Sequence, residues 1–283
     1  MKDQVTIFEV GPRDGLQSLG LQVPTETKIA LIDALSRAGL TKIEATSFVS
    51  PRWVPQMADA QDVMAGISRV PGVRYAALTP NMRGMESAIA AECDEVAIFA
   101  SASEGFSRAN LNCSIEESFE RFGPIMERAR AGGLPVRGYL SAVIKCPYDG
   151  ETPPATVARW VERLLDIGCY EVSLGDTIGA GTPENLNVLF DVLLNHFLPE
   201  KLAGHFHDTH GTACDLIRTS LARGLRTFDA SVAGMGGCPY APGAPGNVNT
   251  RHVMQTVEGL GLAHGVNTKI LCDAEQIVRS IIG

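Results

Sequence analysis

The stretch VTIFEVGPRDG, from Val5 to Gly15, contains the pattern that decides the fold. It starts with a short β-rich run, which is followed by a proline-containing turn that carries the adjacent charged residues Arg13 and Asp14. A longer helical pattern comes next, and the same order of short strand and longer helix recurs to the end of the chain. This alternation predicts a parallel sheet whose strands are joined by helices.

Eight runs of sequence are candidate strands. They are Val5–Glu9, Lys42–Thr46, Arg74–Leu78, Glu95–Ala100, Val136–Ala142, Glu171–Leu174, Leu202–His207 and Thr227–Val232. Amphipathic helical patterns lie between them, for example at Thr27–Ala38 and Ile115–Ala131, and Lys269–Ile282 predicts a closing C-terminal helix. Because one strand–helix unit takes roughly 30 residues, the chain matches an α/β fold, a (β/α)8 TIM barrel with an appended C-terminal helix.

A doubly wound open sheet is the alternative arrangement of the same elements. The chain has neither a GxGxxG after its first strand nor a GxxxxGK[ST] motif, which are the commonest reasons to favour an open nucleotide-binding sheet. No linker or low-complexity segment interrupts the pattern. We therefore expect residues 1–283 to form a single TIM-barrel domain.

Charge and cysteine content narrow the possible partners and locations. The formal net charge of −8 is spread along the chain and no block of consecutive lysines or arginines is present, so we expect no nucleic-acid partner. Seven cysteines without a CxxC pair indicate a reducing compartment. The first residues lack a secretion signal and no apolar run is long enough to cross a membrane, which predicts a cytoplasmic protein without a membrane partner.

Polar residues gather directly after the predicted strands. They are Arg13 and Asp14, Glu44 and Ser47, Asn81, residues 101–104, Asp176 and Thr177, residues 205–208, and residues 238–247. The C-terminal ends of all strands meet at one face of a barrel, and active sites of this fold lie at that face. We therefore expect these side chains to surround a common pocket.

The stretch AGHFHDTHG, from Ala203 to Gly211, predicts a metal site. His205 and His207 lie two residues apart on a predicted strand, so their side chains point to the same face. An isolated pair of this kind is more often one core histidine and one solvated histidine. Asp14 makes a metal site the better interpretation. It follows the first strand, which adjoins the eighth strand in a closed barrel, and Asn247 in the loop after the eighth strand adds an amide oxygen. This mixed set suits Mg²⁺ or Mn²⁺ better than structural Zn²⁺, and His210 is interpreted as a loop residue.

Arg13 and Cys238 each have a structural and a catalytic interpretation. Arg13 and Asp14 alone would be a surface ion pair, but beside Glu9 and Glu44 a permanently charged Arg13 is suited to stabilising negative charge on an oxygen. Cys238 lies in GMGGCPYAPGAPGN, residues 234–247, where five glycines and three prolines suit a lid. A single cysteine is usually inert and buried, but this position after the last strand favours a thiol that handles a proton. The inert interpretation is kept for Cys93, Cys169, Cys214 and Cys272.

Seven motifs, in order along residues 5–262, resemble the 3-hydroxy-3-methylglutaryl-CoA lyase family. They are EVGPRDGLQ (9–17), IEATSFVSPRWVPQM (43–57), NCSIEESFERF (112–122), CPYDG (146–150), EVSLGDTIGAGTP (171–183), HFHDT (205–209) and GGCPYAPGAPGNV (236–248). The HxHDT and Arg-Asp motifs are shared with a wider group of metal-dependent barrel lyases and acyl-CoA condensing enzymes. The cysteine loop and SFVSPRWVPQM are specific to the lyases.

The resemblance implies that the chain cleaves 3-hydroxy-3-methylglutaryl-CoA to acetyl-CoA and acetoacetate, the reaction of leucine degradation and ketone body formation. It implies that Asp14, His205, His207 and Asn247 bind the divalent cation, that Arg13 stabilises an enolate and that Cys238 handles a proton. Glu44 and Asp176 become polar residues of the active site. His205 and Asp14 are both candidates for the base that takes the substrate hydroxyl proton. The implied partner is a small-molecule acyl-CoA, and a homodimer is a further expectation.

The chain departs from the family pattern at three places, which keep other activities open. Ser18, Leu19 and Gly20 stand where relatives often have Asn-Glu-Lys, Arg251 and His252 stand in place of an acidic pair, and Lys145 precedes CPYDG. A different 3-hydroxyacyl-CoA is therefore an alternative substrate. Condensation, as in related synthases, is expected to need a further C-terminal segment, and a purely metal-binding barrel would leave Arg13 and Cys238 without a purpose.

Overall fold

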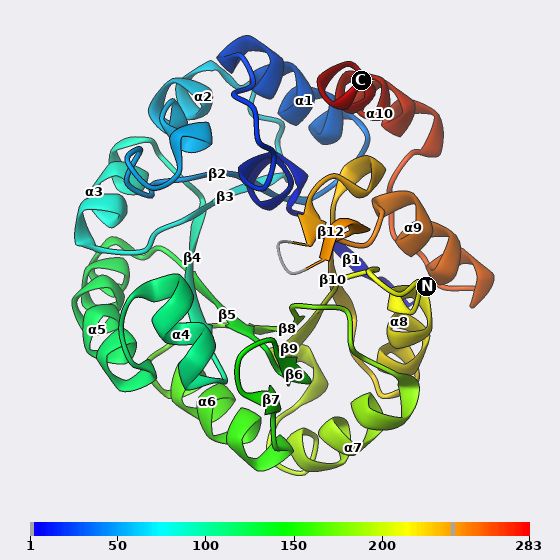
Figure 1. The fold of residues 1–283 in the computed structure, drawn as a ribbon. Helices are drawn as coiled ribbons and strands as arrows, with labels where there is room; N and C mark the ends of the chain where they lie inside the picture. Colours follow the sequence, from blue (N-terminus) through cyan, green and yellow to red (C-terminus); the bar gives the residue numbers. More distant parts are fainter. Residues whose placement is uncertain (1–2, 239–240) are drawn as a thin grey trace.

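The structure is a computed structural model that describes residues 3–238 and 241–283, with the backbone alone described at residues 238 and 241–244. Parallel strands close into a barrel in the order β1-β10-β9-β8-β5-β4-β3-β2. They are β1 (Thr6–Glu9), β2 (Lys42–Ser47), β3 (Arg74–Leu78), β4 (Glu95–Ser101), β5 (Val136–Ser141), β8 (Val172–Asp176), β9 (Leu202–Phe206) and β10 (Thr227–Ala230). Strand β1 pairs with both β2 and β10, which closes the ring and confirms the predicted barrel (Figure 1).

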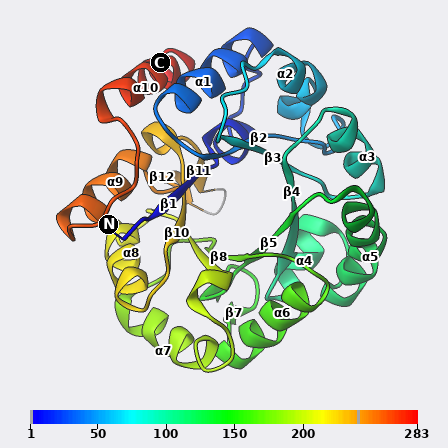
Figure 2. The same cartoon turned by 180° about the vertical axis from the view of Figure 1, so that it is seen from behind.

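Helices form a ring outside the strands, which is seen from both ends of the barrel (Figures 1 and 2). They are α1 (Thr25–Arg37), α2 (Ala60–Gly66), α3 (Met82–Ala90), α4 (Glu104–Leu111), α5 (Ile115–Gly132), α6 (Pro154–Asp166), α7 (Pro183–Leu193), α8 (Ala213–Ala222), α9 (Thr250–Gly259) and α10 (Thr268–Ile282). Helix α10 packs beside α1, so the appended C-terminal helix is confirmed. In the part of the chain that the structure describes, no helix combines the length and apolar character needed to cross a membrane.

Short elements lie in the segments that join the barrel strands to the helices. They are the π-helical turn η1 (Gly11–Gly15), the 3-10 turns η2 (Pro55–Met57), η3 (Pro199–Lys201) and η4 (Val232–Gly234), and two hairpins, β6 (Lys145–Cys146) with β7 (Gly150–Glu151) and β11 (Gly237–Cys238) with β12 (Ala241–Pro245). The sequence did not predict η1 or the hairpins. Three predicted strands end earlier than expected: β5 stops at Ser141, β9 at Phe206 and β10 at Ala230.

The main hydrophobic core lies between the strands and the helices. In β5, Val136 and Leu140 belong to this core, whereas Arg137 and Tyr139 point into the barrel, where the guanidinium of Arg137 lies over the ring of Phe8. Successive side chains of a strand point to opposite faces, so one short strand supplies both an apolar outer face and a polar inner face. The barrel interior is therefore the place where charged groups meet.

Two of the polar residues expected around the pocket serve as helix caps. The side chain of Asn81 accepts a hydrogen bond from the backbone N–H of Gly84 at the start of α3, and Ser103 accepts one from Phe106 at the start of α4. The first backbone N–H groups of a helix have no partner inside the helix, and side chains of this type satisfy them. Asn81 and Ser103 thus lie after strands because the next helix begins at that point of the chain.

Candidate active site

The turn η1 holds Arg13 and Asp14 at the C-terminal end of β1. The backbone N–H groups of Arg13, Asp14 and Gly15 all point at the carbonyl oxygen of Val10, at N···O distances of 3.2, 2.7 and 3.3 Å. The Glu9 carboxylate anchors the start of this turn by accepting a hydrogen bond from the N–H of Gly11 at 2.9 Å. The two charged side chains therefore sit on a short, tightly bonded turn rather than on a loose loop.

The same carboxylate joins this turn to the other side of the site. Glu9 also accepts hydrogen bonds from the N–H of Val232 at 2.8 Å and from the hydroxyl of Thr250 at 2.6 Å. Val232 begins η4 and Thr250 begins α9. One buried side chain thus ties together the segments that follow β1 and β10 and the helix that follows residue 247.

Asp14, His205 and His207 converge on one point. Each offers a ligand atom, and these atoms all lie within 4.8 Å of one another. His207 lies one residue beyond β9 and forms an isolated bridge with Asn247, whose side-chain amide donates a hydrogen bond of 2.7 Å to Oδ2 of Asp14. The structure therefore brings together the four groups that the sequence predicts as metal ligands, while His210 is exposed in the loop that follows.

The protonation states of these groups suit a cation. Burial, together with the neighbouring His205, lowers the pKa of the His207 imidazole to about 4, so the ring is neutral at pH 7. Its Nδ1 is buried and has no hydrogen-bond partner among the described residues. Burial opposes ionisation of Asp14, but the Arg13 charge and the hydrogen bond from Asn247 contribute to a net lowering of the pKa of that carboxyl. A carboxylate and neutral imidazoles are the forms that bind divalent metals.

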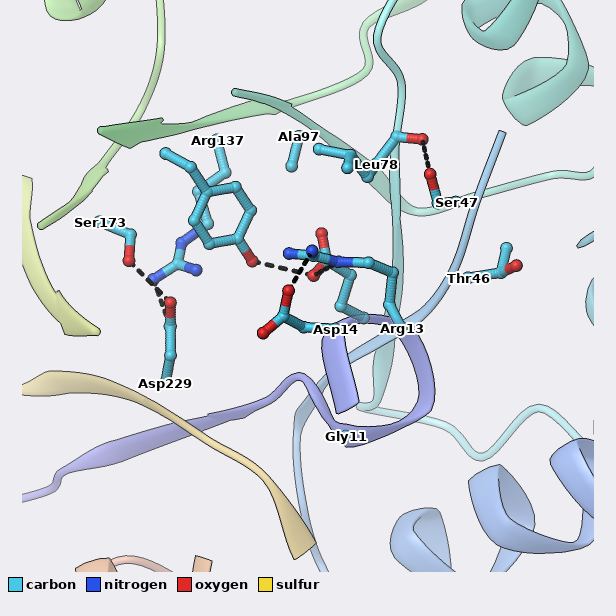
Figure 3. Close-up of polar contacts among 12 residues, drawn as sticks. Gly11, Arg13, Asp14, Thr46, Ser47, Leu78, Ala97, Arg137, Ser173 and Asp229 are labelled. Atoms are coloured by element: carbon cyan, nitrogen blue, oxygen red, sulfur yellow. Dashed lines mark hydrogen bonds and ion pairs between the residues drawn. The ribbon is translucent and has the colours of Figure 1, made fainter. Parts of the chain in front are cut away.

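Arg13 lies beside Asp14 of this cluster (Figure 3), and Glu44 contacts Arg13 from β2. Nε of Arg13 is 2.6 Å from Oε2 of Glu44, and Nη1 of Arg13 is 2.6 Å from Oδ1 of Asp14. The hydroxyl of Tyr139 donates to the same Oε2 of Glu44 at 3.1 Å. Arg13 is thus held by two carboxylates, and within the described part of the chain its Nη2 has no hydrogen-bond partner, which leaves this N–H group for an incoming oxygen.

Asp176 lies at the end of β8, and its own loop occupies its carboxylate. Oδ1 accepts a hydrogen bond of 3.0 Å from the N–H of Ala180, and Oδ2 accepts one of 2.8 Å from Gly181. Burial raises the pKa of the Asp176 carboxyl to about 6 despite these bonds. The contacts that the structure gives Asp176 are therefore those of a residue that shapes the loop after β8.

The cysteine predictions have different outcomes. The side chain of Cys238 lies outside the described residues, so its catalytic role stays a prediction. The other six cysteines are free, and Cys93 and Cys169 are buried. Burial raises the pKa of both of these thiols to about 12, which keeps them protonated and unreactive, as predicted.

A polar layer inside the barrel was not predicted from the sequence. It consists of Arg137, Tyr139, Ser173 and Asp229, four buried side chains on β5, β8 and β10. The available signal was the presence of an arginine and an aspartate inside β-rich runs, at Val136–Ala142 and Thr227–Val232. A charged residue in the middle of a buried strand needs partners, but the sequence does not show which strand supplies them.

The chain is similar to known proteins along nearly its whole length. Residues 4–278 match the model of the HMGL-like family. The mitochondrial hydroxymethylglutaryl-CoA lyase of Rattus norvegicus is 52% identical over 275 residues, covering 97% of this chain and 85% of that protein. The 3-hydroxy-3-isohexenylglutaryl-CoA/hydroxy-methylglutaryl-CoA lyase of Pseudomonas aeruginosa is 52% identical over 281 residues, covering 99% and 93%.

A solved structure agrees with these sequence matches. The crystal structure of the HMG-CoA lyase from Brucella melitensis superposes with a TM-score of 0.97 at 53% identity, over 99% of both chains. The family match covers nearly the whole barrel, including all four predicted metal ligands. The chain therefore belongs to the HMGL-like family.

Proposed function

We propose that this chain cleaves 3-hydroxy-3-methylglutaryl-CoA into acetyl-CoA and acetoacetate and that it uses a divalent cation to do so. The observation that carries the proposal is the convergence of Asp14, His205 and His207 within 4.8 Å at the C-terminal end of the barrel. Relatives that are 52% identical over nearly the whole chain bear the name of this lyase activity. In this proposal, residues 1–283 act as a single catalytic domain.

The described residues fit Mg²⁺ or Mn²⁺. Asp14, His205, His207 and Asn247 would hold the ion with one carboxylate, two imidazoles and one amide, a set without thiolates that leaves positions for a substrate. The buried Nδ1 of His207 has no hydrogen-bond partner within residues 3–238 and 241–283, which fits a ring turned to an ion. A bound cation would lower the pKa of the tertiary hydroxyl of the substrate.

Cleavage starts when a base takes the proton of that hydroxyl. A residue that binds an ion and also accepts a proton needs two free lone pairs. Nδ1 of His205 faces Asp229 at 3.0 Å, which leaves one nitrogen of that ring, whereas each Asp14 oxygen accepts one hydrogen bond, from Arg13 or from Asn247, and keeps a second lone pair. We therefore assign the base to Asp14 rather than to His205.

The electron pair of the alkoxide then forms the ketone of acetoacetate. The bond between the hydroxyl-bearing carbon and the α-carbon of the thioester breaks, and its electrons move to the thioester oxygen as an enolate. Arg13 stabilises this charge through the N–H groups that its two carboxylate partners leave free, with Glu44 keeping the guanidinium in place. Cys238 gives a proton to the α-carbon, which yields the methyl group of acetyl-CoA.

A coupled assay tests the proposal. Purified protein with Mg²⁺ or Mn²⁺ and 3-hydroxy-3-methylglutaryl-CoA should release acetoacetate, and a chelator should stop the release until metal is added back. Cys238→Ala should lose orders of magnitude in turnover while Cys93→Ala, at an inert buried thiol, keeps its rate. Turnover that a chelator does not affect would contradict the metal role, and an unchanged Cys238→Ala would contradict the thiol role.

A longer acyl chain is a second candidate substrate. The name of the Pseudomonas aeruginosa relative covers an isohexenyl-substituted glutaryl-CoA, and the departures at Ser18 and Gly20 lie just after η1. At the other departures, Arg251 pairs with Glu275 of α10 at 2.7 Å, and Lys145 is exposed on β6. Comparing kcat/KM for the two thioesters decides between the substrates.

Other features of the proposal concern partners and location. We place the protein in the cytoplasm, in line with its free cysteines, although the rat relative is named as mitochondrial. The proposed partner is a small acyl-CoA, without nucleic acid or membrane, and a homodimer that pairs through outer helices is also expected. Light scattering on the purified protein measures the oligomeric state, and fractionation of the source cells locates the protein.

A further inference from the structure

Asp229 lies directly behind His205 inside the barrel. The two residues are on neighbouring strands, β10 and β9, and the register pairs Phe228 with Gly204, which sets the next residue of each strand side by side. Nδ1 of His205 is 3.0 Å from Oδ2 of Asp229. The imidazole therefore has one nitrogen turned to Asp229, and it also offers a ligand atom to the cluster with Asp14 and His207.

The Asp229 carboxylate is fixed from two other sides. The hydroxyl of Ser173 on β8 donates a hydrogen bond of 2.7 Å to the same Oδ2. Nη2 of Arg137 lies 2.8 Å from Oδ1, an ion pair rather than a directed hydrogen bond, and the carboxylate side chain is 1% exposed (Figure 3). Asp229 thus has the surroundings of a carboxylate, because a hydroxyl donates to its Oδ2 and a guanidinium faces its Oδ1.

Arg137 is itself held in place. Its Nε donates to Oε1 of Glu171 at 2.8 Å, and its guanidinium carbon lies 4.2 Å from the centre of the Phe8 ring. Asp229 therefore has a rigid partner on the side away from His205. The chain of contacts runs from Glu171, which directly precedes β8, through Arg137 on β5 and Asp229 on β10 to His205 on β9.

An ionised carboxylate accepts hydrogen bonds and has none to donate. Ser173 and His205 share Oδ2 of Asp229, so the ring nitrogen that faces this oxygen must carry the hydrogen. The other ring nitrogen, Nε2, then has the lone pair, and a histidine that binds a metal commonly donates its other N–H to a carboxylate in this way. We propose that Asp229 is a positioning residue that holds His205 in the Nδ1–H form with Nε2 turned to the metal site. The metal part of this inference rests on the proposed function.

Asp229→Asn tests the inference, because the amide keeps the shape of the side chain but can present an N–H group to the ring. Glu171→Gln is the matched control, since it removes a carboxylate from the same arginine without touching His205. In ¹⁵N spectra of the metal-free protein, with the His205 signals assigned from a His205→Ala sample, the wild type and Glu171→Gln should show a protonated Nδ1 and a bare Nε2. Asp229→Asn should lose this form.

Metal affinity gives a second readout, measured by titrating each protein with Mn²⁺ in a calorimeter. Asp229→Asn should bind Mn²⁺ about 10- to 100-fold more weakly than wild type, while Glu171→Gln stays within about threefold. An equal loss in both variants would overturn the inference, because the effect would then act through Arg137.

Two results on the wild type separate this inference from the proposed function. A bare Nδ1 in the wild-type spectrum would overturn the inference whether or not Asp229→Asn folds. Failure of wild-type protein to bind Mn²⁺ would overturn the metal role in the proposed function, and the spectra would still decide whether Asp229 sets the tautomer.

Discussion

Arg13 and Glu44 form a buried ion pair between the turn after β1 and strand β2, with Nε of Arg13 2.6 Å from Oε2 of Glu44. Arg13 is 5% exposed and Glu44 is fully buried. Burial raises the pKa of the Glu44 carboxyl, and the adjacent Arg13 charge opposes this shift. The pair fixes the direction of a guanidinium that also contacts Asp14, so the metal cluster and the proposed enolate site share one cation.

Arg13→Lys should lower kcat by about 10²- to 10³-fold, because an ammonium cannot satisfy Glu44 and Asp14 and still present an N–H group to the enolate oxygen. Steady-state kinetics measure kcat, and circular dichroism checks the fold. Arg159→Lys on the exposed face of α6 is the matched control and should keep wild-type rates. A near-wild-type kcat for Arg13→Lys would show that Arg13 does not stabilise the transition state.

Glu44→Gln should leave Arg13 in the site but free it to move. Gln keeps an oxygen that can accept from Nε and from the Tyr139 hydroxyl, but it lacks the charge that holds the guanidinium. A misplaced catalytic group costs about 10²-fold in rate, so kcat should fall by that order while Mn²⁺ affinity changes little. A large loss of Mn²⁺ affinity with unchanged kcat would place Glu44 in the metal site instead.

Gly236→Ala should weaken the metal site through Asn247. The backbone of Gly236 has φ +110°, and a Cβ there would lie 3.0 Å from Nδ2 of Asn247. Gly72→Ala is a control for backbone strain alone, because Gly72 has φ +88° and nothing lies within 4 Å of its Cβ position. Both variants should lose about 1 kcal/mol or more of stability, but only Gly236→Ala should bind Mn²⁺ more weakly. Equal Mn²⁺ affinity in the two variants would show that a Cβ at residue 236 does not disturb Asn247.

Glu9 should make the stability of the protein depend on pH. Burial raises the pKa of the Glu9 carboxyl from 4.5 to about 7, against three hydrogen bonds that favour the carboxylate. The folded protein thus keeps a proton that the unfolded chain releases. The resulting stabilisation is fully present below pH 4.5 and is lost as the pH rises through about 7.

Between pH 5.5 and 8, this group should reduce the free energy of unfolding by about 2 kcal/mol. Urea denaturation at the two pH values measures it. Glu9→Gln should remove that part of the decrease, whereas Thr250→Val, which deletes one hydrogen-bond donor to Glu9, should keep it. The same decrease in wild type and Glu9→Gln would assign the pH dependence to another group.

The order of strands and helices, and some of their boundaries, could be predicted because their signals are local. The predicted run Arg74–Leu78 matches β3, and Ile115–Ala131 differs from α5 by one residue. In α5, Ser114 and Glu117 form a capping box and Gly133 follows with φ +64°, so both ends of the helix are encoded beside it. The candidate metal ligands could also be predicted, because an HxH pair in extended backbone directs both rings to one side.

Residues whose function depends on another strand could not be predicted in the same way. A barrel strand is buried on both faces, so its sequence does not reveal which charged residue faces which partner. The pairing of β1 with β10 and the register of β10 against β9 set the distance from Asp14 to the histidines and place Asp229 behind His205. Asp176 is a different case, since its carboxylate accepts hydrogen bonds from backbone N–H groups of its own loop.

By itself, then, the sequence determined the alternation of strands and helices, the closure into a barrel and the residues that can bind a metal. Periodicity, caps and turns act over a few residues, and the chain encodes them where they occur. Only the tertiary structure decided which buried charges compensate one another and which nitrogen of His205 is free. Those outcomes depend on contacts between strands that are far apart in sequence, where burial makes an unpaired charge costly and register selects its partner.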